Sequence, residues 1–419
     1  MTTLAGRRRE ALTESKAALI RLSEEQASAL NKIGSQLASD KHWWGQSESD
    51  ERGSVISCRP ESSGFWSVRV DNAIGLIAVG DLQITVEPKI PIEHLLFLFS
   101  VSGRIPRVQP QTGELGVGVS LFAVIARWFV IAVEALFRRD IIRDYREEED
   151  ILSTVQGRIH VVPTARRVLT GHSDAMCTYE DYSFDTPINR ILRGAGEIIA
   201  RTSLAGDETR RRARGIVARL QDAGPLQPTD LLIEIDRRSG YYRDSLCWAR
   251  EILLARGRSL ATGSLSSWTF LIRTPEAVEA ALRQLMAGQL GKKRVPDAGR
   301  RRHLKGSSLT FTPDIVIDEG VAVADVKYKI RSDDWQRGDL YQIIAFSAIF
   351  QSRFAAIIDF CSEMAQSPAT VQVNELQIRR VAWPSIAELR PQLAADVFLN
   401  RVNQWVSSIS EMEASAHSA

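Results

Sequence analysis

At 419 residues, with 44% hydrophobic and 25% charged residues, the chain is long enough for two or three packed domains and too apolar to be disordered. Its longest apolar runs are too short or too interrupted to span a bilayer, and no continuous apolar stretch follows the basic residues near the N-terminus. We therefore expect a cytoplasmic protein without a membrane partner. The four cysteines lie far apart without a CxxC pair, which argues against zinc and against a disulfide framework.

The N-terminal segment is predicted to begin with a helix and to continue as a small β-sheet. Residues 12–39 are rich in Ala, Leu, Glu and Gln, and Ser23 followed by Gln26 has the pattern of a capping box. Between residues 53 and 89, short β-branched or alternating runs are separated by turn residues, which predicts an antiparallel sheet. The expected strands are Ser54–Cys58, Phe65–Val70, Ile74–Val79 and Gln83–Val86.

The rest of the chain predicts a mixed α/β (α+β) protein in three parts. Beyond residue 263, strands alternate with helices and a helical tail follows from about Ser385, which indicates an α/β domain. We therefore expect an N-terminal domain of a small β-sheet plus helices (1–150), a mainly helical middle region (151–262) and a C-terminal α/β domain (263–419). Helices are expected at Ile92–Ser102, Leu121–Arg138, 186–220 and 239–256, with an exposed loop at 103–118.

Two local clusters of basic residues are the places where nucleic acid could bind, because the net charge of the chain is only +2. One cluster brackets a Pro/Asp/Gly stretch and is predicted to form a loop, and the other lies in a predicted helix. A run of like charges is more often solvated surface, so neither cluster assigns a function alone. Their members are Lys292, Lys293, Arg294, Arg300, Arg301, Arg302 and Lys305, and Arg210, Arg211, Arg212 and Arg214.

Residues 312–329 form the segment that points to chemistry. Two β-rich runs flank the Glu319-Gly320 pair, so the segment predicts a β-hairpin. A two-residue turn at this pair places Asp314 directly opposite Asp325 on the neighbouring strand. Because side chains at positions i and i+2 share a face, Lys327 lies on the same side as both carboxylates.

Opposed carboxylates destabilise a hairpin unless a positive charge lies between them. Mg²⁺ commonly binds one or two carboxylates together with substrate phosphates, so the pair predicts a magnesium site, with Mn²⁺ as an alternative. Lys327 would orient the attacking water or offset charge on the phosphate. Glu279, on the preceding predicted helix, and Gln342, near the start of the following one, lie where they could reach the site. A non-catalytic hairpin is the competing interpretation, since Asp-x-Lys patterns also occur by chance.

These residues resemble the PD-(D/E)xK nuclease superfamily and, more closely, the McrC family, the endonuclease partner of a GTP-driven AAA+ motor in modification-dependent restriction. The similarity extends over most of residues 70–350 in the family's order. Besides the hairpin, the similar segments are Ile74–Leu82 with Glu87–Ile90, Gln156–Ile159, Tyr179–Arg190, Phe270–Ile272 leading to Glu279, and Asp339–Gln342.

The resemblance implies a restriction-endonuclease-like C-terminal domain that cleaves double-stranded DNA carrying a modification such as 5-methylcytosine. It implies that Asp314 and Asp325 are metal ligands, that Lys327 is the catalytic lysine, that Glu279 is an auxiliary acid and metal ligand, and that Gln342 is a supporting polar residue. It also implies that the N-terminal domain docks onto the AAA+ GTPase or ATPase ring and stimulates it. The chain has no Walker-type loop, so the nucleotide would bind to the partner.

Several residues of the N-terminal and middle parts have two interpretations. Trp43, Trp44 or Trp66 could anchor the partner interface, although tryptophans of this kind more often fill a small core. We expect structural roles for residues of the central segments, because turns and helix starts use such residues routinely. They are Gly157, Arg158, Asp185, Pro187 and Asn189.

Two functional alternatives stay open from the sequence. One is a non-catalytic regulator whose nuclease-like domain binds DNA or the motor, and the other is a stand-alone repair or RNA-processing nuclease. Intact Asp314, Asp325 and Lys327 argue against the first, and the large N-terminal region without a recognisable nucleic-acid-reading module argues against the second. The modification recognised, the number of metal ions, the stoichiometry and the nucleotide used by the partner are not determined by the sequence.

Overall fold

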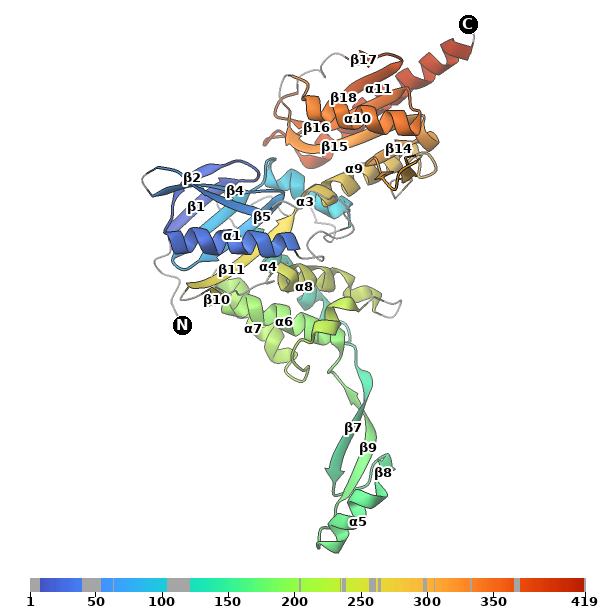
Figure 1. Ribbon diagram of the computed structural model, residues 1–419. Helices are drawn as coiled ribbons and strands as arrows, with labels where there is room; N and C mark the ends of the chain where they lie inside the picture. Colours follow the sequence, from blue (N-terminus) through green and yellow to red (C-terminus); the bar gives the residue numbers. More distant parts are fainter. Residues whose placement is uncertain are drawn as a thin grey trace. The chain divides into compact units, whose positions relative to one another are not determined.

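The structure is a computed structural model, and it describes residues 8–39, 54–62, 64–103, 121–202, 205–233, 235, 239–255, 261–262, 265–296, 300–304, 306–331, 334–364 and 370–417. Contacts between Cα atoms group the chain into two compact units, one within Gly116–Gly257 and the other within Ala5–Leu115 and Arg258–Ala419. Figure 1 shows the mixed α/β fold expected from the sequence. No helix in the described ranges is long and apolar enough to cross a membrane.

The N-terminal part of the second unit contains two sheets, where we predicted one sheet preceded by a helix. A five-stranded sheet has the order β1-β6-β5-β11-β10, with β1 parallel to β6 and the other pairs antiparallel. A three-stranded antiparallel sheet has the order β2-β4-β3. The strands are β1 (Arg8–Thr13), β2 (Ala18–Arg21), β3 (Ile56–Pro60), β4 (Phe65–Val70), β5 (Ala73–Val79), β6 (Leu82–Glu87), β10 (Ala261–Thr262) and β11 (Leu265–Arg273).

Helix α1 (Glu24–Ser39) begins later than predicted, because residues 8–21 form two strands. Its start confirms the capping box: the Ser23 N–H donates to Gln26 Oε1 and the Gln26 N–H donates to Ser23 Oγ, both at 3.1 Å. Pairing with β6 and β4 overrides the local helix propensity of residues 12–21. Trp66 is partly buried against the core of these sheets, so it has the core role that we considered the more common one. Trp43 and Trp44 lie outside the described residues.

The C-terminal sheet has the order β14-β15-β16-β18-β17, with β15, β16 and β18 parallel and the edge strands antiparallel. All eight residues of β16 are buried, as is typical of a central parallel strand covered on both faces. The elements are α9 (Pro275–Leu290), β12 (Arg302–His303), β13 (Thr310–Phe311), β14 (Ile315–Ile317), η4 (Asp318–Gly320), β15 (Ala322–Ile330), α10 (Arg337–Phe350), β16 (Phe354–Cys361), β17 (Val371–Val373), β18 (Leu376–Pro384) and α11 (Pro391–His417).

The two parts of this second unit are joined by β11 and by helix α3 (Ile92–Val101). Strand β11 pairs with β5 of the N-terminal sheet and leads directly into α9. On α3, the buried His94 accepts a hydrogen bond at Nδ1 from Trp383 Nε1 at 3.0 Å. His94 Nε2 therefore carries the proton and donates to the Leu389 carbonyl oxygen at 2.8 Å. The residues that precede the first unit in the sequence and those that follow it thus form one compact unit.

The first unit combines helices with a β-arm that we did not predict. Its helices are α4 (Leu121–Leu136), α6 (Pro187–Arg201), α7 (Asp207–Arg219), η2 (Pro228–Leu232), η3 (Gly240–Tyr242) and α8 (Arg243–Ala255). All except η2 lie in segments that we expected to be helical, but the segment 186–220 forms two helices, α6 and α7, rather than one. The arm contains β7 (Asp144–Leu152), β8 (Arg158–Ile159), α5 (Val161–Leu169) and β9 (Ala175–Ser183), with α5 at its end (Figure 1). Residue 150, where we placed a boundary, lies inside β7, which pairs with β9 along its length.

Candidate active site

The hairpin predicted from residues 312–329 is present with the expected register. Ile315 pairs with Ala324 and Ile317 with Ala322, and the Val321 N–H donates to the Asp318 carbonyl oxygen at 3.3 Å across the turn. Glu319 has φ +64° and Gly320 has φ +120°, values that a tight hairpin turn requires. Continuing this register by one residue beyond Ile315 places Asp314 opposite Asp325.

The two aspartates are in contact. Asp314 Oδ2 accepts a hydrogen bond from the Val326 N–H at 2.7 Å, and the Asp314 and Asp325 carboxyl groups are close enough to hydrogen-bond to each other. Asp325 is 2% exposed, whereas Asp314 keeps some exposed surface although protein surrounds its carboxyl group. Loss of hydration, followed by repulsion from Glu279 and from Asp325, raises the pKa of Asp314 well above its usual value.

Glu279 reaches the same site from α9. Loss of hydration raises its pKa to about 7, with further contributions from the negative charges of Glu276 and Asp325, while Arg283 and Lys327 oppose the shift. The helix is tied to the hairpin by Arg283, whose Nε donates to the Asp314 carbonyl oxygen at 2.6 Å. The structure therefore brings three acidic side chains together from two elements.

Lys327 lies on the same side of β15 as Asp325, as predicted. Its Nζ is 2.6 Å from Asp325 Oδ2 and donates to Gln342 Oε1 on α10 at 2.7 Å. These two contacts hold the ammonium group beside the carboxylates, where its charge is available to a bound anion. The structure thus brings together all five residues that the sequence suggested.

The chemistry of the site fits a hard divalent cation. Neighbouring negative charges contribute to the raised pKa of both Asp314 and Glu279, so the cluster of carboxyl groups favours binding of positive charge, and the Lys327 ammonium already lies 2.6 Å from Asp325 Oδ2. No group of three or more His, Cys, Asp or Glu side chains among the described residues could hold a metal ion. A bound Mg²⁺ would therefore need water and substrate oxygens besides the aspartates, which is its common mode of binding.

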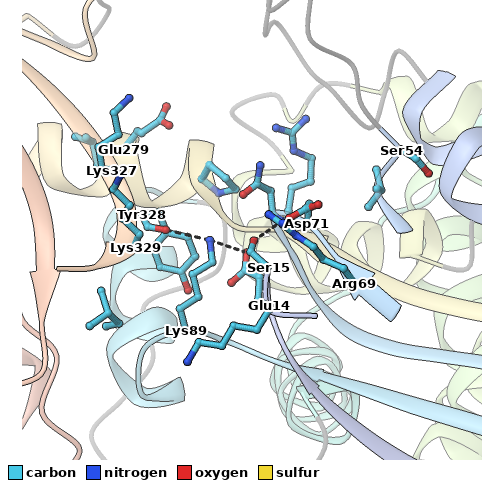
Figure 2. Close-up of a pocket in the computed structure, with 17 residues that line it drawn as sticks. Glu14, Ser15, Ser54, Arg69, Asp71, Lys89, Glu279, Lys327, Tyr328 and Lys329 are labelled. Carbon is cyan, nitrogen blue, oxygen red and sulfur yellow. Dashed lines mark hydrogen bonds and ion pairs between the residues drawn. The ribbon is translucent and has the colours of Figure 1, made fainter. Parts of the chain in front are cut away.

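A pocket of about 780 Å³ adjoins these residues within the second unit (Figure 2). Glu279 and Lys327 lie together at one side of it, and Glu14, Lys89 and Tyr328 are grouped beside them. The N-terminal sheets therefore contribute to the wall of the candidate site. Sequence reasoning missed this contribution, because Glu14 and Tyr328 are separated by more than three hundred positions in the chain.

A second charged cluster continues from the site along α10 and the sheet. Lys329 Nζ is 2.5 Å from Asp339 Oδ2, and Arg380 Nε lies 3.1 Å from Asp359 Oδ2 in a pair that is almost completely buried. Loss of hydration raises the pKa of Asp359 to about 6 despite the neighbouring Arg380. The alternation of Asp325, Lys327 and Lys329 was the available sequence signal for this cluster, but its acidic partners come from other elements.

Much of the predicted basic loop is used to hold the hairpin. Arg294 forms a bidentate pair with Asp318, with its Nη2 2.6 Å from Oδ2, and Arg300 Nη2 is 3.0 Å from Glu319 Oε1. Arg302 lies over the Phe350 ring, 4.5 Å from its centroid. In the helical cluster, Arg210 pairs with Asp207 and Arg212 with Glu134, while Arg211 and Arg214 are exposed. Lys305 lies outside the described residues.

Gly157, Asp185, Pro187 and Asn189 of the middle segment have the structural roles that we expected. Asp185 accepts the Gly224 N–H at 2.7 Å and pairs with Arg190, and the Asn189 side chain donates to the carbonyl oxygens of Ile142 and Phe184, both at 2.9 Å. Thr186 and Pro187 form the start of α6. Gly157 has φ +63°, and a Cβ at this position would lie 2.3 Å from the Thr178 carbonyl oxygen.

The comparisons with known proteins agree with this fold. Residues 68–358, more than half of the chain, match the family described as McrBC 5-methylcytosine restriction system component. A segment of 144 residues is 23% identical to the Type IV methyl-directed restriction enzyme EcoKMcrBC of Escherichia coli (strain K12), covering 34% of this chain and 41% of that protein. The matched segment is thus less than half of that relative's length.

Two solved structures share the fold. One is a refined half-complex from a tetradecameric assembly of Thermococcus gammatolerans McrB AAA+ hexamers with bound McrC, with a TM-score of 0.70, 14% identity and coverage of 95% of this chain and 100% of that chain. The other is the cryo-EM structure of the Thermococcus gammatolerans McrBC complex, with a TM-score of 0.50, 15% identity and coverage of 68% and 88%. The resemblance found in the sequence is therefore confirmed, and the chain belongs to the McrBC 5-methylcytosine restriction system component family.

Proposed function

We propose that this chain is the Mg²⁺-dependent DNA endonuclease subunit of a McrBC-like restriction system. The observation that carries the proposal is that Asp314, Asp325 and Lys327 share one side of the hairpin and that Glu279 approaches them from α9. Acidic oxygens beside an ammonium group form a site that suits a metal-assisted attack on a phosphodiester. The relatives act in methyl-directed restriction, which supports modified double-stranded DNA as the substrate.

Asp314 and Asp325 would hold the metal ion, with Glu279 beside them. The chemistry that Mg²⁺ supplies in such a site is polarisation of the phosphate and a lowered pKa for the attacking water. Lys327 would orient that water or stabilise the charge that develops on the phosphate oxygens, because its ammonium group is held beside Asp325. Gln342 would keep the ammonium group in place through its 2.7 Å hydrogen bond, and the Val326 N–H would orient Asp314.

We propose that the chain works with a nucleotide-hydrolysing AAA+ motor, because the structure with the higher TM-score is one of McrB AAA+ hexamers with bound McrC. We expected the motor to dock on the N-terminal domain; the exposed side chains of the arm of the first unit favour a docking surface there instead. Helix α5 has no buried residue, and Val161, Val162, Val168 and Leu169 are between 58% and 86% exposed. Exposed apolar side chains grouped in this way are typical of a protein–protein contact.

The test is cleavage of modified and unmodified DNA by the full chain with the motor, its nucleotide and Mg²⁺. We expect Asp325→Ala to abolish cleavage and Lys327→Ala to lower it by at least about 100-fold. Stimulation of the motor by both variants should stay near the wild-type level, because neither side chain lies on the arm. The matched control is Asp396→Ala, which removes an exposed aspartate from α11 of the same unit. Equal cleavage by wild type and Asp325→Ala would remove the catalytic assignment.

A further inference from the structure

A buried polar contact joins the N-terminal sheets to the strand and the helix that carry the candidate active site. Glu14, directly after β1, is 0% exposed, and Lys89, two residues after β6, lies with its Nζ 4.0 Å from Glu14 Oε1. Both side chains point toward Tyr328, the residue that follows Lys327 on β15 (Figure 2). An ion pair that is nearly excluded from water is costly to maintain unless its members are held by further contacts.

Lys89 holds the backbone of β15. Its Nζ donates to the Tyr328 carbonyl oxygen at 3.0 Å and lies 4.7 Å from the centroid of the Tyr328 ring. The pairing of β15 with β16 shifts register between Val326 and Ile330, so the sheet ladder is irregular at this place. A strand that departs from its ladder needs other partners to fix its course. Lys89 supplies one of them immediately beside Lys327.

Glu14 holds the start of helix α9. Its Oε1 accepts a hydrogen bond from the hydroxyl of Thr274, which is completely buried. Thr274 occupies the N-cap position of α9, yet its side chain makes no capping hydrogen bond to the helix. A threonine at this position normally caps its own helix. Here its hydroxyl binds the N-terminal sheet instead, five residues before Glu279.

The pKa shifts of Glu14 and Tyr328 agree with the close contact of these side chains and Lys89. Loss of hydration raises the pKa of Glu14 while Lys89 opposes the shift, and the pKa of Tyr328 is raised by burial and by the Glu14 carboxylate beside it. The Lys89 ammonium, the Thr274 hydroxyl and the Tyr328 hydroxyl all oppose the rise in the pKa of Glu14. The Lys89 ammonium has the largest share in compensating the buried carboxylate.

We propose that Glu14 and Lys89 are positioning residues of the nuclease centre, which fix β15 and α9 from the N-terminal side and thereby align Lys327 with Glu279. This inference rests on the proposed function, since it assigns these two residues to the same reaction. It makes the N-terminal sheets a working part of the active site. The alternative is that Glu14 and Lys89 only stabilise the packing of the N-terminal sheets against the C-terminal part of the second unit.

The decisive variant is Lys89→Met in the full chain, which keeps an unbranched side chain and removes the charge. We expect the kcat for DNA cleavage with the motor and Mg²⁺ to fall by about 10- to 100-fold, the cost typical of slightly misplaced catalytic groups, while the KM for DNA changes less than about twofold. Lys89→Arg should restore most of the loss, because a guanidinium can also donate to the Tyr328 carbonyl and stack on its ring.

The matched control is His94→Gln, which weakens a different link between the same two parts, the contact of α3 with Trp383 and Leu389. It should lower the melting temperature but leave kcat within about twofold of wild type, because His94 touches neither β15 nor α9 through these bonds. Equal losses of kcat in His94→Gln and Lys89→Met would show that the pair acts through packing alone and would overturn the proposal.

A second measurement does not depend on cleavage. Hydrogen–deuterium exchange of the backbone amides in residues 322–331 and 275–283 should be faster in Lys89→Met than in wild type, and unchanged in His94→Gln. Should Lys89→Met not fold, Glu14→Gln is measured in its place with the same expectations. Unchanged exchange in both segments would overturn the positioning role. Wild-type protein that does not cleave DNA would instead refute the proposed function, and the exchange result would still decide whether the contact holds β15.

Discussion

Removing the charge of Glu279 should make the metal-free protein more stable at alkaline pH while impairing the nuclease. In the folded protein, Glu279 has a pKa of about 7, above the usual 4.5, because it has lost hydration and faces Glu276 and Asp325. Between pH 4.5 and about 7, Glu279 therefore keeps its proton in the folded protein but has released it in the unfolded chain. Stability must fall as the pH rises from about 4.5 to 7 and stay low above that window.

The magnitude follows from the two pKa values. At about 1.4 kcal/mol per pKa unit, the difference between 4.5 and about 7 corresponds to roughly 3 to 4 kcal/mol at most. Solvent that reaches the partly exposed Glu279 residue screens its charge, so we expect a loss of roughly 1 to 3 kcal/mol between pH 4.5 and 8. Glu279→Gln has no carboxyl group to ionise and should not show this part of the loss.

The assay is the melting temperature of the metal-free full chain between pH 5 and 8, for wild type, Glu279→Gln and the control Glu363→Gln. Glu363 is an exposed glutamate of the same unit, so its variant should follow wild type. At pH 8 the Glu279→Gln variant should melt roughly 3 to 10 °C higher than wild type, with little difference at pH 5. Added Mg²⁺ should then stabilise wild type more than the variant. Identical pH profiles for Glu279→Gln and wild type would refute the reasoning that lost hydration and neighbouring negative charges raise the pKa of Glu279.

Three further predictions follow from other parts of the structure. Arg380→Met leaves Asp359 buried without its ion-pair partner and should lower the free energy of unfolding, measured with denaturant, by about 3–5 kcal/mol. Adding Asp359→Leu should recover most of that loss, and a double variant as unstable as the single one would contradict this. Gly34→Ala should destabilise the second unit by at least about 1–3 kcal/mol, since the added Cβ would lie 2.3 Å from a backbone oxygen of β3, and an unchanged melting temperature would disprove that close contact. The double variant Val162→Ser with Leu169→Ser should fold normally but bind the motor about 10-fold or more weakly in a pull-down titration, and unchanged binding would place the docking surface elsewhere.

Local sequence patterns were sufficient for those features that depend on neighbouring residues. The hairpin register that brings Asp314 to Asp325 follows from side-chain alternation and one tight turn, and the structure has the same register. The capping box at Ser23 and the helix start at Thr186 are equally local, because their hydrogen bonds join residues three positions apart. These features could be predicted from the order of residues alone.

The tertiary structure alone decided the contacts between distant segments. Residues 8–21 have a helical composition, yet they form strands because β6 and β4 offer them partners. Strand β11 pairs with β5 although a whole compact unit separates them in sequence, and Thr274, directly after β11, contacts Glu14. Lys89 likewise contacts Tyr328 across a separation of 239 positions. The pattern of hydrophobic residues does not predict such pairings, because the stability of a strand depends more on the neighbouring strands and side chains that cover it than on its own residues. For this reason the amino-acid sequence by itself was enough to identify the acidic residues and the lysine of the candidate site. Only the tertiary structure showed which contacts hold them in place.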